Sequence, residues 1–180
     1  RTGTGTAAET PYIPQLLGQP ELQQDLLARM TALMATALDP AHARGLADSL
    51  FAGHEADLNA DHERWKAEFE RPDPKTTHTE LTDFIGARPA YLLQYLAQRT
   101  GRKLRVVSLE VPEPHLGELL IDGLALSPGL HEITCFQGVR IPLEFRATPG
   151  VELSGWKGVA VEKSGVWLDP DRARLVKPLF

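Results

Sequence analysis

The sequence predicts an α+β protein, with an N-terminal helical half followed by a small antiparallel all-β module, either a meander or a sandwich. Before Gly101, apolar residues recur at intervals of three and four, which is typical of amphipathic helices. After Gly101 they alternate at intervals of two, which is typical of half-buried strands. This change of period predicts a flexible linker over residues 1–14, a helical region over residues 15–101 and a β module over residues 102–180.

The first two helices are indicated by spacing and by start signals. A helix is expected over residues 20–38, with one apolar stripe formed by Leu22, Leu26, Met30, Leu33, Met34 and Ala37. Asp39 can then cap a second helix, and Pro40 suits its first helical position. Gly53 is expected to end or interrupt this second helix.

Further helical segments follow. Residues 57–69 carry apolar side chains on one helical face, at Leu58, Trp65 and Phe69. Pro72 and Pro74 predict a break after this segment. Thr77 and Glu80 then have the three-residue offset of a capping box, which predicts that the next helix begins there. 

The last predicted helical stretch lies on both sides of Pro89. This proline is expected to interrupt the helix or to start a new one. A 3–4 apolar pattern resumes at Tyr91, Leu92, Tyr95 and Leu96. Arg99 followed by Gly101 indicates a helix C-terminus.

The β half is divided by turn signals about every ten residues. They are Asp122-Gly123, Ser127-Pro128-Gly129, Gln137-Gly138, Thr148-Pro149-Gly150 and Ser164-Gly165. Gly, Pro and Asn or Asp at such positions favour tight turns, and this regular spacing is typical of a strand meander or a small sandwich.

The composition of the chain indicates which classes of partner are not expected. The net charge is −5, and Lys and Arg are scattered rather than gathered into a stripe, so nucleic acid is not an expected partner. No window reaches the about 18 consecutive apolar residues of a membrane span. Cys135 is the single cysteine, so it cannot form an intramolecular disulfide and is expected to be a small buried apolar residue.

One local pattern suggests calcium. The charged ligand offsets of an EF-hand loop are reproduced by Asp57, Asn59, Asp61 and Glu68. His62, however, stands where the sharp turn of such a loop calls for Gly, and Arg64 stands where an apolar residue is usual. The alternative is a solvated helix face, whose acidic residues are favoured near the helix N-terminus.

No complete catalytic site is predicted. The sequence contains neither a Gly-x-Ser-x-Gly elbow nor an HExxH motif, and no catalytic residue is assigned. An aromatic platform for a glycan or another extracellular polymer could be formed by Phe136, Trp156 and Trp167. The alternative is that these aromatic residues fill the core of a small β module, which needs large side chains.

Three stretches carry a family resemblance. They are HERW (62–65), FIGARPAYLLQYLAQRTG (84–101) and GELLIDGLALSPGLHEITCFQGVRIPLEFRATPGVELSGW (117–156). The first two resemble the region that follows the kinase core in spore coat protein H (CotH kinase-like) family proteins. The third is similar to the C-terminal β module of many bacterial members.

The resemblance implies a function without local catalysis. The nucleotide-binding Lys and metal-binding Asp residues of the family's kinase core have no counterpart here, so none is carried over. The chain would be a non-catalytic C-terminal segment of a secreted protein, acting as a structural or binding module in an extracellular or cell-surface assembly with a protein partner. Alternatively, it would complete the C-terminal lobe of a split or processed kinase whose nucleotide site lies upstream.

Overall fold

A computed structural model describes residues 18–68, 70 and 72–180, and the chain forms two compact units. The helical unit comprises Ala37–Leu93, and the β unit comprises the described residues up to Thr36 together with Gln94–Phe180. The predicted α+β class is confirmed. The change from helix to strand does fall near Gly101, but the compact units divide elsewhere, because the first helix and the end of the last one belong to the β unit. The predicted linker over residues 1–14 lies outside the described residues.

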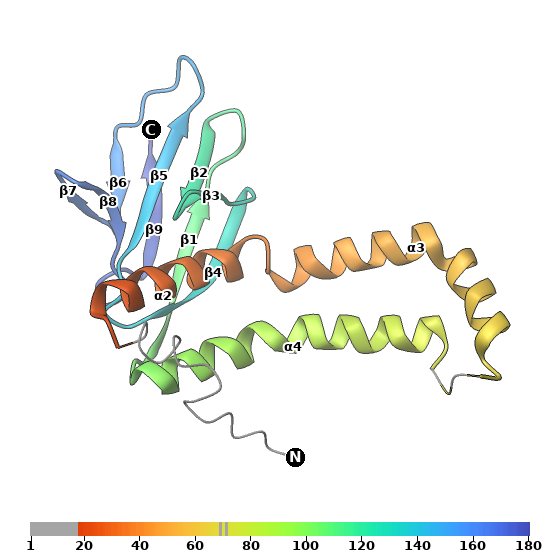
Figure 1. Cartoon of the computed structure of the whole chain (residues 1–180). Helices are drawn as coiled ribbons and strands as arrows, with labels where there is room; N and C mark the ends of the chain where they lie inside the picture. The colour runs from red at the N-terminus through yellow and green to blue at the C-terminus, as the bar shows by residue number, and fades with distance from the viewer. Residues whose placement is uncertain (1–17, 69, 71) are drawn as a thin grey trace. The chain divides into compact units, whose positions relative to one another are not determined.

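The described residues contain three helices, α2 (Pro20–Ala35), α3 (Pro40–Trp65) and α4 (Pro74–Thr100) (Figure 1). The expected interruption at Gly53 is wrong, and α3 joins the predicted second helix to residues 57–65 of the next predicted segment, whose Phe69 lies outside the described residues. A single Gly inside a helix costs only about 1 kcal/mol relative to Ala, so it does not break a long helix by itself. None of these helices combines the length and apolarity that crossing a bilayer requires.

The starts of α3 and α4 are set by aspartates. As predicted, Asp39 caps α3, and its Oδ1 accepts hydrogen bonds of 3.0 Å from the backbone N–H groups of Ala41 and His42. The predicted capping box at the start of α4 is wrong. Asp73 instead accepts the Thr76 backbone N–H at 3.0 Å and the Thr76 hydroxyl at 2.7 Å. These bonds from Thr76, its hydroxyl first, hold the pKa of Asp73 below its usual value.

Helix α4 continues through Pro89, so the expected interruption there is also wrong. A proline removes one backbone N–H from the ladder, and the remaining hydrogen bonds of a long helix can carry the chain past it. The predicted stop is confirmed. Gly101 adopts φ 66°, and the Arg102 N–H donates to the Ala97 carbonyl at 3.0 Å, as in the Schellman motif that glycine favours.

Nine strands follow. They are β1 (Leu104–Val111), β2 (Gly117–Ile121), β3 (Leu124–Ala125), β4 (Gly129–Phe136), β5 (Ile141–Ala147), β6 (Gly155–Lys157), β7 (Ala160–Glu162), β8 (Gly165–Leu168) and β9 (Leu175–Leu179). One sheet has the order β4-β1-β9-β6 and the other the order β3-β2-β5-β8-β7. The pair β1–β9 is parallel and the other pairs are antiparallel. The module is therefore two-sheeted rather than a single meander.

Each predicted turn signal lies where one strand gives way to the next, and Gly129 and Gly165 are themselves the first residues of β4 and β8. The hairpin from β2 to β3 shows why residue types alone were sufficient to predict a turn. Asp122 and Gly123 adopt φ values of 48° and 76°, the left-handed pair that a two-residue type I′ turn requires. Asp tolerates this region better than most residues, and Gly does so without a steric cost.

The core of the β unit is formed by alternating strand residues and by one face of α2. In β1, Val107, Leu109 and Val111 are buried while their neighbours are more exposed. Helix α2 contacts β4 and β5, one strand from each sheet, and contributes Leu27 and Ala32, both fully buried. The helix therefore belongs to this core, which the expected boundary at Gly101 did not anticipate.

Cys135 is fully buried in β4, as expected. Burial raises the pKa of its thiol to about 12 from a reference value of 9.0, so the native protein should hold about a thousandfold less thiolate than an ordinary cysteine. We expect iodoacetamide to modify Cys135 at mildly alkaline pH only after denaturation. Mass spectrometry of native and urea-treated protein measures this, and rapid native labelling would contradict it.

Candidate functional site

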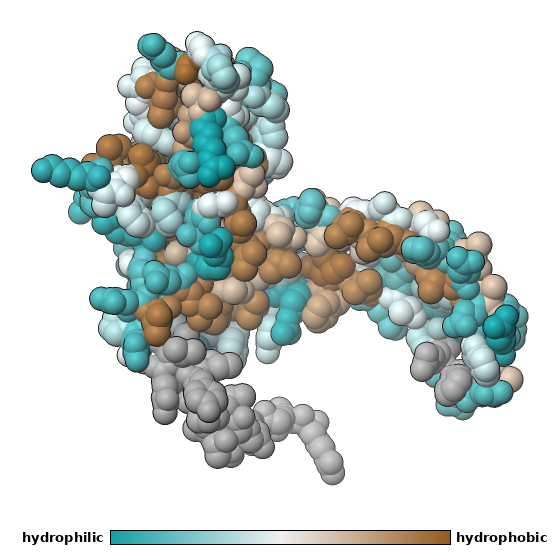
Figure 2. Space-filling view, turned by 45° about the horizontal axis from the view of Figure 1, so that its top comes forward, coloured by the Kyte–Doolittle hydropathy of each residue, from teal (hydrophilic) through white to brown (hydrophobic). Residues whose placement is uncertain are grey.

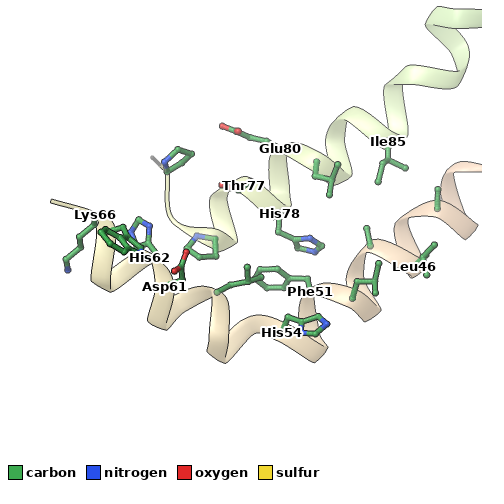
Figure 3. Close-up of a pocket in the computed structure, with 18 residues that line it drawn as sticks. Leu46, Phe51, His54, Asp61, His62, Lys66, Thr77, His78, Glu80 and Ile85 are labelled. Atoms are coloured by element: carbon green, nitrogen blue, oxygen red, sulfur yellow. The ribbon is translucent and has the colours of Figure 1, made fainter. Parts of the chain in front are cut away.

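A groove of about 1210 Å³ runs between α3 and α4, within the helical unit. Figure 3 shows side chains from both helices directed into it, and Figure 2 shows hydrophobic residues along these helices. The larger apolar residues of its wall are Leu46, Leu50, Phe51, Leu58, Trp65, Leu81 and Ile85. Concave apolar surface with a few polar groups is the usual character of a binding site.

The α3 side of the groove follows from residue spacing. Leu46, Leu50, Leu58 and Trp65 are separated by four, eight and seven residues, and these steps return to the same face of a helix with 3.6 residues per turn. The face is continuous only because α3 passes Gly53 without a break. One uninterrupted helix therefore turns two short predicted stripes into one apolar wall.

A few polar and aromatic contacts connect α3 to α4. The rings of Phe51 and His78 stack with centroids 4.3 Å apart and an interplanar angle of 8°, and Figure 3 shows them pointing toward each other. His78 Nε2 lies 2.9 Å from Asp48 Oδ1. Arg44 Nε donates to the Thr82 carbonyl at 3.1 Å. These contacts fix the pairing of the two helices along one side of the groove.

The rest of the interface is open. No residue of α3 is buried, and Leu46 and Leu50 are 57% and 58% exposed. Few α-carbons of α3 come within 8 Å of α4, whereas helices packed at the usual axis separation of about 8–10 Å make many such approaches. Isolated helices gain little stability from propensity alone, since most of it comes from packing an apolar face. The helical unit thus carries an apolar face that its own residues do not cover.

Some charged side chains of the groove wall have an oppositely charged partner and others do not. Lys66 lies 2.6 Å from Glu63, and this hydrogen bond and its charge hold the pKa of Glu63 low. Asp61 and Glu80 also line the wall, and neither carboxylate forms an ion pair or hydrogen bond within the described residues. The wall therefore has two uncompensated carboxylates.

The predicted calcium ligands do not form an EF-hand loop. Asp57, Asn59 and Asp61 lie inside α3, and Glu68 lies beyond its end. Successive helical residues are about 100° apart around the axis, so Asp57 and Asp61 share a face while Asn59 projects from another. Among the residues described, no three His, Cys, Asp or Glu side chains gather as a metal site.

Calcium binding by these residues remains a prediction, and the structure gives it a specific signature. Convergence of Asp57, Asn59 and Asp61 requires the last turns of α3 to unwind, because their helical positions point in different directions. Calcium at millimolar concentration should then release or absorb heat in calorimetric titration and reduce the helical circular dichroism signal. No heat and an unchanged signal would contradict the prediction.

The three aromatic residues predicted as a platform are not equivalent. Phe136 is fully buried, so it belongs to the core and cannot contact a polymer. Trp156 lies in β6 and Trp167 in β8, which belong to different sheets. Trp167 has the Arg140 guanidinium 5.1 Å from its ring centroid. Polymer binding by the two half-buried tryptophans remains a prediction.

Comparison with known proteins adds no assignment. No family model matches the chain, and neither the curated proteins nor the solved structures contain a significant match to it.

The groove was not predicted from the sequence. The available signal was the common face of Leu46, Leu50, Leu58 and Trp65, which the expected break at Gly53 divided between two helices.

Proposed function

We propose that this chain is a non-catalytic binding module, and that the groove between α3 and α4 receives a helix of another protein. The observation that carries this proposal is the 26-residue helix α3, which presents an apolar face and buries none of its residues. Apolar helices commonly enter such grooves by placing side chains at intervals of three and four residues against the wall. A third helix would cover the leucines that the helical unit leaves exposed.

The energetic gain is of the right size for specific binding. Leu50 and Leu46 each expose more than half of their surface. Burial of one such side chain contributes about 1.5–3 kcal/mol before the costs of association are subtracted. Several together can therefore support binding in the micromolar range, at about −8 kcal/mol.

A designed peptide tests the proposal on the full chain. The peptide is a helix of about 20 residues, with Leu at every third or fourth position and Gln elsewhere, which spans about 30 Å. Fluorescence anisotropy of the labelled peptide should show saturable binding. Leu50→Ser should weaken it about tenfold, because a buried leucine contact is lost.

Leu130→Ser is the matched control. Leu130 lies in β4, outside the groove, and is 68% exposed, against 58% for Leu50. The same substitution there should leave peptide binding unchanged. Absence of binding, or equal weakening by the two variants, would overturn the groove as the docking site.

We further propose a setting for this module from its resemblance to CotH-like proteins. In that proposal the chain is the C-terminal portion of a secreted protein in an extracellular or surface assembly. The alternative, a C-lobe part of a split kinase, is favoured by the same groove, since a missing lobe would leave an apolar face exposed. The reading frame upstream of Arg1 distinguishes them from an unrelated module. A kinase-like core there supports the family, and its absence there would contradict it.

A further inference from the structure

The charge of the protein is concentrated in the helical unit. Residues 37–93 contain 11 of the 24 Asp and Glu residues and 6 of the 19 Lys and Arg residues, so they carry the whole formal net charge of −5. The rest of the chain contains 13 of each and is formally neutral. The apolar groove therefore lies in the acidic part of the molecule.

The wall of the groove itself also carries negative charge. Asp61 lines it from α3 and Glu80 from α4, and Figure 3 shows Asp61 beside the groove and the Glu80 side chain directed away from α3, at the outer edge. Neither has an ionic partner in the described residues. Lys66, which also lines the wall, is paired with Glu63, with its Nζ 2.6 Å from Oε2. A helix seated in the groove would thus meet unpaired negative charge at its edges.

Resting on the proposed function above, we propose that the occupant is an amphipathic helix of a partner protein whose apolar face is flanked by Lys or Arg. Charges at the rim of an interface select among partners by attraction and repulsion, while the apolar centre supplies most of the affinity. A second copy of this chain fits poorly, because it would bring another acidic helical unit, also of net charge −5, against the first.

Three peptides with one leucine face and different rims test this inference on the full chain. Their flanking positions carry Lys, Gln or Glu. Binding should be tightest for the Lys peptide and weakest for the Glu peptide, with about a tenfold difference in Kd at low salt. The difference should shrink as salt is added, because exposed charges are screened.

The carboxylates are tested by substitution. The double variant Asp61→Asn/Glu80→Gln should remove most of the preference for Lys over Glu while retaining binding of the Gln peptide. The control, Glu113→Gln/Glu132→Gln, removes the same charge from exposed positions of the β unit and should retain the preference.

Each result decides between the two proposals. Equal binding of all three peptides would leave the groove as a docking site and overturn the basic partner. Loss of the preference in both double variants would overturn the assignment to Asp61 and Glu80. If no peptide binds, light scattering separates two failures. A dimer would make a second copy the occupant, and a monomer would overturn the proposed function itself.

Discussion

Truncation of Phe136 to Ala is expected to lower the free energy of unfolding of the β unit by about 3–5 kcal/mol. Phe136 is the last residue of β4 and is fully buried among the core residues of the sheets. The loss combines the transfer of the ring out of the core with the cavity that remains. Such a change is a large part of the total stability of a small domain, about 5–15 kcal/mol.

Urea denaturation followed by tryptophan fluorescence measures this effect, since Trp156 and Trp167 report on the β unit. Leu130→Ala is the matched control in the same strand, because Leu130 is 68% exposed. It should change the stability by less than about 0.5 kcal/mol. Similar losses for the two variants would contradict the assignment of Phe136 to the core.

Replacement of Gly158 by Ala is expected to lower the free energy of unfolding by about 2–5 kcal/mol. Gly158 adopts φ 76°, and a Cβ there would collide with the backbone carbonyl of Leu175 at the start of β9. The variant thus combines a left-handed backbone with an overlap that a backbone atom cannot easily relieve.

Gly150→Ala separates the two costs. Gly150 also has a positive φ, 88°, but a Cβ there would meet nothing within 4 Å. It should cost only the backbone term of about 1–2 kcal/mol. Equal melting temperatures for the two variants would contradict the close approach of Gly158 to β9.

Local chemistry made much of the fold predictable. Asp39 followed by Pro40 marked the start of α3, and Asp122-Gly123 marked a tight hairpin, because each acts through its own neighbouring backbone. The start of α4 was misassigned because Thr77 and Glu80 have suitable spacing but compete with Asp73, which engages Thr76 first. Residue spacing alone did not show which of the two candidate caps begins the helix.

In the two long helices, the local propensity of single residues did not predict where the helix ends. Gly53 and Pro89 are helix breakers by propensity, yet both lie inside long helices. The residues of the EF-hand pattern form a helix for a related reason: the offsets of Asp57, Asn59 and Asp61 place ligands around one ion only when the chain forms a loop. In a helix the same spacing separates their directions.

The groove required information that no single segment contains. Its walls come from α3 and α4, and the distance between two antiparallel helices cannot be predicted from the sequence of either one. Likewise, the apolar stripe of α2 predicted a helix but not that it would pack on β4 and β5. Tertiary packing, rather than propensity, decides such placements.

We infer that the helical unit is incompletely packed on its own and is completed by a partner helix. Hydrogen–deuterium exchange of the full chain tests it most directly. The backbone N–H groups of α3 should exchange much faster than those of β1 and β4, and should slow when the Lys-flanked peptide is added. Exchange of α3 as slow as that of β1 in the free protein would show a unit already complete, and would contradict the claim.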